Sequence, residues 1–369
     1  MAELLKNVYN KEFITILSGI ITEVLPEFEA SYFAKKVFDS DWKNKELKQR
    51  MSHIAYAMKF QMPEEYEKRI SVVLELVEQI KMKGFDSTLE WMFLPEFIDD
   101  LDENNYKVSI NALEKVTQFT TCEFAVRPFI LKYPEQLIVQ MMEWASHENA
   151  NVRRLATEGC RPRLPWSMAL PFLKNDPNPI MPILEKLKND SSLTVRRSVA
   201  NNLNDIAKDN PETVIKTAKK WIGKTEETDW VVKHASRTLL KQGNLEVMKL
   251  FGFGDINELE IKAFKVNTPT VKIGEYLSFS FRLKNQTKTR TKLRLEYGLY
   301  YQKANGNLAR KVFKISEKMY KPNSETEINK RQSFKIISTR KFHVGLHQVS
   351  IIINGVELDR LDFELKKEE

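Results

Sequence analysis

Hydrophobic spacing divides the chain into two parts. Up to about residue 250, apolar positions recur every three or four residues, the spacing of a helix that buries one face. After Gly254, apolar and polar residues alternate instead, which is typical of strands. We therefore predict a multidomain chain, with an all-α region over residues 1–252 and an all-β region over residues 253–369. Examples of the two spacings are Phe13, Leu17, Ile20 and Val24, and Leu277, Phe279, Phe281 and Leu283.

A weak internal repeat indicates how the helices are organised. Three short segments each follow an acidic or polar turn and open an apolar helix: residues 151–154, 194–197 and 231–234. They start 43 and 37 residues apart, within the range of paired-helix HEAT repeats. We expect a HEAT-like α-solenoid in which the basic residue after each valine lines one surface.

The β region has the pattern of an immunoglobulin-like sandwich. Further alternating runs surround Ile261, Val312 and Phe334, giving about seven strands in roughly 115 residues. Asn305-Gly306 and Asn354-Gly355 are strong hairpin turns. This fold alone assigns no chemistry.

The charge of the chain indicates which partners it could bind, and its cysteine content indicates its cellular compartment. The 369-residue chain has a net charge of +8, of which the residues from Gly254 onward carry 23 Lys and Arg against 14 Asp and Glu. The first 253 residues are close to neutral, with 35 against 36, so any positive surface there must be a local cluster. Only Cys122 and Cys160 are present, no apolar run has the length of a membrane span, and we expect a cytoplasmic protein.

The densest local cluster lies between Ala150 and Trp166. On a helix that starts near Asn149, Arg154, Glu158 and Arg161 share one face. Pro162 and Pro165 then fix a loop that carries Arg163 and Trp166. Guanidinium groups suit phosphates and an aromatic ring suits a base or sugar, but a helix end with salt bridges and a core tryptophan has the same pattern.

Three acidic residues have basic neighbours at helical spacing. Glu123 precedes Arg127 by one turn, Glu158 lies in the cluster above, and Asp205 shares a helix face with Arg197. Each one alone is ordinarily a surface ion pair. Because they fall in consecutive repeats, they would converge on one cationic surface, where carboxylates stabilise positive charge on a sugar and arginines hold the flanking phosphates.

No metal or cofactor site is predicted. The five histidines are scattered, and His343 and His347 straddle Gly345 in a predicted strand or turn. The sequence contains neither a phosphate-binding loop motif nor a dinucleotide-binding motif, so no motif supports nucleotide hydrolysis or dinucleotide-dependent redox chemistry.

Several segments of the helical region are specific enough to compare with known proteins. They are the segment from Glu123 through Arg127 to Phe129, RRLATEGCRPRLPW (residues 153–166) and VRRSVANNLNDIAKDNP (residues 195–211), and LKQRMSHIA (residues 47–55) fits as well. Through these segments, residues 1 to about 250 closely resemble the AlkC family of DNA alkylation-repair glycosylases. Cys160 stands where a small residue such as serine is expected. Some members of that family carry a C-terminal immunoglobulin-like domain, which agrees with the alternating pattern.

The resemblance implies a chemistry and roles for the residues. The family excises cationic N-alkylated bases, such as 3-methyladenine and 3-methylcytosine, from double-stranded DNA without full base flipping. Glu123, Glu158 and Asp205 would face the sugar and base of the lesion, and Trp166 would pack against them. Arg127, Arg154 and Arg161 would grip the DNA backbone or hold the carboxylates, and Arg163 and Arg197 would also contact DNA.

Several alternatives stay open from the residues alone. A HEAT adaptor that binds proteins would have an apolar concave face, and a damage sensor would bind lesions without releasing the base. The basic C-terminal region, with clusters at 284–294 and 330–341, is either a DNA clamp or a solvated surface. The range of lesions and the carboxylate that orients water are undetermined, and a monomer is expected.

Overall fold

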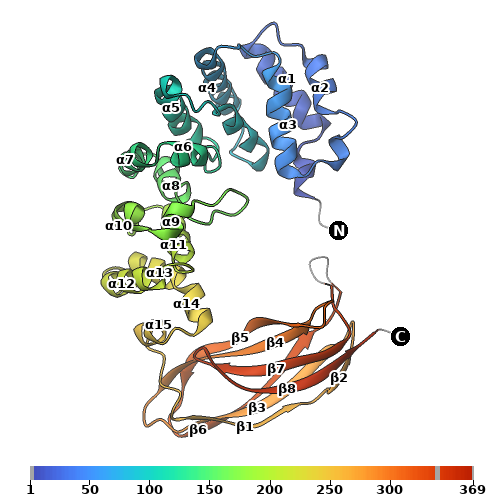
Figure 1. Ribbon diagram of the computed structural model, residues 1–369, viewed down its shortest axis with the longest axis vertical. Helices are drawn as coiled ribbons and strands as arrows, with labels where there is room; N and C mark the ends of the chain where they lie inside the picture. Colours follow the sequence, from blue (N-terminus) through green and yellow to red (C-terminus); the bar gives the residue numbers. More distant parts are fainter. Residues whose placement is uncertain (1–3, 337–340, 368–369) are drawn as a thin grey trace. The chain divides into compact units, whose positions relative to one another are not determined.

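The chain folds into two compact units, drawn in Figure 1. The computed structural model describes residues 4–336 and 341–367. The first unit comprises Met1–Val214 with Trp221–Ala235, and the second comprises Ile215–Lys220 with Ser236–Glu369. No helix within the described residues is long and apolar enough to span a membrane.

The first unit is built from helices and short 3₁₀ turns, as the helical spacing predicted. The predicted amphipathic helix near the N-terminus is α1, in which the Asn10 side chain accepts a hydrogen bond from the Phe13 amide and so caps the first turn. Its buried side chains include Leu17 and Ile20. The helices are α1 (Lys11–Val24), α2 (Ala30–Val37), α3 (Leu47–Lys59), α4 (Tyr66–Met82), α5 (Tyr106–Thr117), α6 (Val126–Lys132), α7 (Pro134–Trp144), α8 (Ala150–Glu158), α9 (Pro171–Asn175), α10 (Met181–Leu187), α11 (Leu193–Ile206), α12 (Pro211–Trp221, shared with the second unit) and α13 (Glu226–Ala235), with the 3₁₀ segments η1 (Leu5–Val8), η2 (Trp42–Asn44), η3 (Leu89–Phe97), η4 (Glu103–Asn105) and η5 (Asn178–Ile180).

The predicted HEAT-like repeat is confirmed by the packing of α8, α11 and α13. These helices carry the three repeated segments, and α11 packs against both α8 and α13. Each of α8 and α11 also packs against the helix that precedes it, α7 or α10. The valines that open the segments, Val152 and Val195, are fully buried. The repeat therefore places the ends of α8 and α11 side by side.

The expectation that the basic residue after each valine lines one surface fails for the first two repeats, whereas Lys233 of the third is exposed on α13. Arg153 donates to the carbonyls of His147 and Glu148, and Arg196 donates to those of Asp190 and Ser191, the same two places in the preceding turn. Both arginines thus close the turn before their helix. In α8 and α11 the second arginine, Arg154 or Arg197, is the more exposed of its pair, because it lies one helical position further round.

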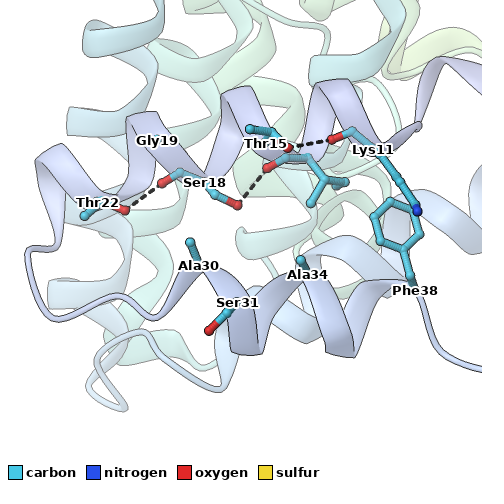
Figure 2. A pocket seen from close by; sticks show the side chains of 10 residues that line it. Lys11, Thr15, Ser18, Gly19, Thr22, Ala30, Ser31, Ala34 and Phe38 are labelled. Atoms are coloured by element: carbon cyan, nitrogen blue, oxygen red, sulfur yellow. Dashed lines mark hydrogen bonds between the residues drawn. The ribbon is translucent and has the colours of Figure 1, made fainter.

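A groove runs between α1 and α2, and Figure 2 shows it from close by. It has a volume of about 530 Å³ and is lined mainly by small side chains. The hydroxyls of Thr15, Ser18 and Thr22 each donate to the carbonyl four residues earlier in α1. These hydroxyls are therefore already satisfied within the helix, and none of the predicted site residues lines the groove.

The second unit contains the predicted β-sandwich. A three-stranded sheet has the order β1-β3-β6, and a five-stranded sheet has the order β2-β8-β7-β4-β5. The alternating apolar residues of both sheets form one buried core, which includes Phe279, Phe281, Leu295 and Ile351. The strands are β1 (Leu259–Val266), β2 (Thr270–Lys272), β3 (Tyr276–Asn285), β4 (Thr291–Gln302), β5 (Leu308–Tyr320), β6 (Ser324–Ser333), β7 (Gly345–Ile353) and β8 (Val356–Lys366).

Eight strands appear among the described residues, one more than the alternation indicated. The additional strand, β2, has three residues and pairs parallel with β8, so it is too short to show a period. Both predicted hairpin turns are present, and Asn354 and Gly355 both have positive φ, 46° and 78°, as a two-residue hairpin requires.

Two short helices, α14 (Arg237–Gln242) and α15 (Leu245–Leu250), belong to the second compact unit. A Cβ atom added to Gly355 would lie 1.9 Å from the Cα of Gly243, so the turn after α14 packs directly on the β7–β8 hairpin. The predicted boundary at residue 252 marks the change from helix to strand, whereas the second compact unit already includes every residue from Ser236 onward. Hydrophobic period cannot detect this, because the two helices are still helical.

Candidate active site

The three predicted carboxylates lie in one row with arginines between them. Glu158 ends α8, Asp205 lies in the last turn of α11, and Glu123 lies in the turn that leads into α6. Their positions follow from the stacking of consecutive repeats, which brings the ends of α8 and α11 together. We call Glu123, Arg154, Glu158, Arg161 and Asp205 the carboxylate–arginine row.

Each arginine of the row bridges two carboxylates. Arg154 Nη2 lies 2.5 Å from Glu123 Oε2 and 4.0 Å from Glu158 Oε1. Arg161 Nη1 lies 2.6 Å from Glu158 Oε1, and its Nη2 lies 2.8 Å from Asp205 Oδ2. Positive and negative groups therefore alternate along the whole row, which fixes the position of every carboxylate.

The centre of the row is almost closed to solvent. Glu158 is 6% exposed, Arg161 is 7% exposed and Asp205 is 2% exposed. Burial by itself lowers the pKa of Arg161, but the carboxylates of Glu158 and Asp205 outweigh it and raise that pKa above its usual value. Arg161 is thus a permanent cation held between two acids, and removing it would leave buried negative charge uncompensated.

Three further side chains complete the row, and sequence reasoning did not identify them. Ser198 Oγ donates to Glu158 Oε2 at 2.6 Å, and Thr121 Oγ1 donates to Glu123 Oε2 at 2.8 Å. Lys208 Nζ lies 2.9 Å from Asp205 Oδ1. Only Lys208 could have been identified from the sequence, because it follows Asp205 by three residues, in the turn after α11.

Glu123 differs from the other two acids because one of its carboxylate oxygens can still accept a hydrogen bond. Both oxygens of Glu158 and both oxygens of Asp205 accept hydrogen bonds. Glu123 uses Oε2 for Arg154 and Thr121, and its Oε1 accepts no hydrogen bond from the described residues. This oxygen is the one in the row that is open to a water molecule or a ligand.

The side chain of Arg127 presents no surface to DNA, in contrast to its predicted role as a DNA-binding residue. Its side chain is fully buried and donates to the carbonyls of Gly159, Arg161 and Met168. Burial lowers the pKa of Arg127 to about 10. The residue closes the loop after α8 from inside, and its place in an apolar stretch (Val126–Ile130) was a signal that it could be buried.

The loop after α8 presents Trp166. In Figure 1 it extends from between α8 and α9, away from the helical layers. The main chain of Trp166 has φ of +63°, and its ring is 61% exposed. Lys48 Nζ, on α3, donates to the Trp166 carbonyl at 2.8 Å and lies 4.7 Å from the centre of the Phe124 ring. The ring therefore stands on an anchored backbone, and the prediction of a core tryptophan is excluded.

Arg163 and Arg197, the other two arginines predicted to contact DNA, differ in whether they form an ion pair within the protein. Arg163 is exposed but forms a two-point ion pair with Asp209, in which Nε and Nη2 lie 2.8 Å and 2.6 Å from the carboxylate oxygens. Arg197 is exposed on α11 and forms no ion pair with any described residue. Arg197 is consequently the freer of the two for an external anion.

Both cysteines are buried. Burial raises the pKa of the Cys160 thiol to about 12 and also raises that of Cys122, so neither is a thiolate at neutral pH. Cys160 lies beneath the row, where its sulfur accepts a hydrogen bond from Asn202. Within residues 4–336 and 341–367, no three His, Cys, Asp or Glu side chains are grouped so that they could hold a metal ion.

Comparison with known proteins identifies the family. Residues 98–239 match the family model described as DNA alkylation repair enzyme, and residues 260–367 match the C-terminal Ig-like domain of the uncharacterised protein YhaZ. The chain is 39% identical over 361 residues to the uncharacterized protein YhaZ of Bacillus subtilis (strain 168), which covers 98% of this chain and 99% of YhaZ.

A solved structure is similar over the whole chain. It is that of Pseudomonas fluorescens alkylpurine DNA glycosylase AlkC bound to DNA containing an abasic site analog, with a TM-score of 0.91 and 34% identity, covering 99% of this chain and 100% of that one. The chain belongs to the AlkC family. Like the AlkC structure it combines helical repeats with a C-terminal strand region, and the entire carboxylate–arginine row lies inside the matched repair domain. The predicted fold class, a HEAT-like α region followed by an immunoglobulin-like β region, is confirmed.

Proposed function

We propose that this protein is a monofunctional DNA glycosylase that hydrolyses the N-glycosidic bond of cationic N-alkylated bases in double-stranded DNA. 3-Methyladenine and 3-methylcytosine are the substrates of this class. The observation that carries the proposal is the carboxylate–arginine row, followed along the chain by a loop with the exposed Trp166, in a chain similar to an alkylpurine DNA glycosylase. A protein-binding adaptor has no need of three fixed carboxylates in one row.

The chemistry fits a row of fixed acids. An alkylated base that already carries positive charge leaves with the electrons of the bond to C1′ and becomes neutral, so it needs no protonation. The sugar becomes an oxocarbenium-like cation, which nearby carboxylates stabilise. A water oxygen then bonds to C1′, and its proton passes to a carboxylate or to solvent. Glu158, at the middle of the row, is the main stabilising group, and Glu123 Oε1, which still has acceptor capacity, orients the water.

The arginines of the row act on the acids and not on the phosphates. Arg154 and Arg161 are each held between two carboxylates, so they keep the acids in place. Trp166 packs against the sugar or base, and Arg197 contacts the DNA backbone. Because arginine side chains fill the space between the acids, the row is a packed surface, which supports action on the lesion without full base flipping.

The decisive experiment is release of free methylated base from methylated duplex DNA, with no metal or cofactor added. We expect release by the wild type and a rate about 10²- to 10³-fold lower for Glu158→Gln, the range for loss of one preorganised stabilising group. Glu135→Gln, an exposed glutamate on α7, is the matched control and should retain the wild-type rate.

The outcomes separate this proposal from a damage sensor. If the wild type releases no base but still binds lesion-bearing duplex selectively, the protein is a sensor and the catalytic roles are wrong. If Glu158→Gln releases base as fast as the wild type, the row is structural.

The strand unit supplies salt-dependent DNA affinity in this proposal. Its net charge supports this, and Lys288 and Arg290, in the first basic cluster, are exposed and form no ion pair with any described residue. Residues 337–340 of the second cluster lie outside the described residues. Lys288→Gln with Arg290→Gln should reduce the slope of log affinity against log salt by about 2, roughly 1 for each lost phosphate contact. An unchanged slope would make these residues a solvated surface. We further propose a cytoplasmic monomer.

A further inference from the structure

An exposed aromatic surface on α2 and α3 has no role in the proposed chemistry. Tyr56 is 60% exposed, Phe60 is 51% exposed and Tyr32 is 40% exposed. The rings of Tyr56 and Phe60 meet edge to face with their centres 4.9 Å apart. Single exposed apolar side chains are ordinary, but a contiguous exposed cluster of them marks a binding surface. We call Tyr32, Tyr56 and Phe60, with the lysines between them, the aromatic surface.

The aromatic surface is also cationic. Lys36 Nζ lies 4.5 Å from the centre of the Phe60 ring and 5.5 Å from that of Tyr32. Neither Lys35 nor Lys36 forms an ion pair with a carboxylate of the described residues. The nearby acid, Asp39, is already engaged by Lys45 and His53. The net positive charge therefore remains available to an anionic partner.

A pocket adjoins the rings. It has a volume of about 480 Å³, within the range of small-molecule sites. Its walls include Tyr32, Tyr56 and His53 together with both lysines. Aromatic faces beside ammonium groups form the combination that holds a nucleotide, since the ring stacks on the base and the cation binds the phosphate.

The aromatic surface shares α3 with Lys48, which anchors the Trp166 loop, and Ser52 between them donates to the Glu96 carboxylate. Lys48, Ser52, Tyr56 and Phe60 are spaced four residues apart, so they follow one face of α3. Lys48 begins this line and bonds to the Trp166 carbonyl, as described above. From Lys48 to Phe60 the helix rises about 18 Å, which equals about five nucleotide steps of a DNA strand.

An intact duplex cannot use aromatic rings in this way. Paired bases are stacked on their neighbours, so only unpaired nucleotides present a face to a side chain. We propose that the aromatic surface binds unpaired nucleotides of the DNA strand where the duplex that flanks the lesion has opened locally. The inference rests on the proposed function for the substrate, but the surface itself can be tested without any lesion.

The test is fluorescence anisotropy with an undamaged, fluorescein-labelled oligothymidylate and the full-length protein. Replacing Tyr56 or Phe60 by alanine should weaken binding about 5- to 150-fold for each ring, the effect of losing one stacked base. Tyr56→Phe keeps a ring and should bind like the wild type. Val139→Ala, at a side chain 62% exposed on α7, is the matched control and should also bind normally.

A blunt-ended duplex of the same length gives the second readout. Its affinity should be unchanged in Tyr56→Ala/Phe60→Ala. The proposal is overturned if this double variant binds oligothymidylate as tightly as the wild type, or if it loses duplex and single strand equally. It is also overturned if sedimentation shows that the wild type self-associates through these rings. Circular dichroism of each variant confirms folding, which exposed positions should not impair.

Base release from methylated duplex, measured on the same preparations, separates the two proposals. A wild type that releases no base but needs Tyr56 and Phe60 for oligothymidylate would refute the glycosylase function and leave the single-strand surface standing. A wild type that releases base but binds oligothymidylate without these rings would refute the surface alone.

Discussion

Replacing Arg161 with leucine is expected to destabilise the helical unit strongly. Arg161 lies 2.6 Å from Glu158 and 2.8 Å from Asp205, and all three side chains are less than a tenth exposed. Removing one partner of a buried ion pair costs about 3 to 5 kcal/mol. Because Ser198 and Lys208 still contact the two acids, we expect the lower end, about 3 kcal/mol.

The loss should depend on pH. Without Arg161 the two buried carboxylates are tolerated better when protonated, so the folded variant takes up protons more readily than its unfolded chain. Stability that comes with proton uptake is present at low pH and is lost as pH rises. The deficit relative to the wild type should therefore be largest near pH 7.5 and smaller near pH 5, the lowest pH at which the wild type is still expected to be stable.

Tryptophan fluorescence during urea unfolding measures this deficit in the helical unit alone. All six tryptophans precede residue 235 and lie in that unit. Arg163→Leu is the matched control, because Arg163 also pairs with an aspartate through two hydrogen bonds but is exposed. Its loss should cost no more than about 1 kcal/mol. Equal losses for the two variants, or a deficit for Arg161→Leu that does not change with pH, would refute the argument.

Three further outcomes are expected. Gly159→Ala should lose about 1 to 3 kcal/mol in urea unfolding, because the new Cβ would lie 2.7 Å from Val126 Cγ1 in a packed site; an unchanged midpoint would show that the site yields. Burial lowers the pKa of His347, so its contribution to stability is present above pH 6.5 or so and is lost as pH falls toward the folded-state pKa; by calorimetry, His347→Gln should show a smaller drop in the melting temperature of the strand unit between neutral and mildly acidic pH, and an equal drop would exclude this histidine as a cause. Trp166→Ala should slow single-turnover base release about 5- to 150-fold while the loop stays in place, because Lys48 holds the carbonyl and not the ring; unimpaired release would remove the tryptophan from the site.

Spacing along the sequence predicted the elements well but not the direction of individual arginines. The alternation around Phe279 and the Asn354-Gly355 turn were sufficient to predict strands and a hairpin, since both depend on local geometry. Arg153 and Arg154 are adjacent and chemically identical, yet one closes a turn and the other joins two acids. That difference depends on where the preceding helix ends, which spacing places only within a few residues.

The same limit applies to the candidate site. The row of acids could be anticipated because Glu158 and Asp205 occupy similar places in consecutive repeats. The burial of Arg127 could not, since it results from the loop after α8 folding back over the side chain. Ser198 and Thr121 also escaped notice, because a hydroxyl becomes a partner of a carboxylate only when another segment brings the two together.

The carboxylate–arginine row helps to explain why the helical region is nearly neutral while the strand region is basic. The first 253 residues are nearly neutral, and in the helical unit Arg153, Arg154, Arg161 and Arg163 each pair with a carboxylate. Under the proposed function, chemistry on a cationic lesion needs acids that balance the arginines at this place, because excess positive charge would repel the alkylated base and the developing sugar cation. Apart from Arg197, affinity for the DNA backbone would then come from elsewhere in the chain, and the strand region, with 23 basic against 14 acidic residues, has the charge for it. Under the proposed function, raising salt should therefore weaken binding much more than it slows the cleavage of base from DNA already bound.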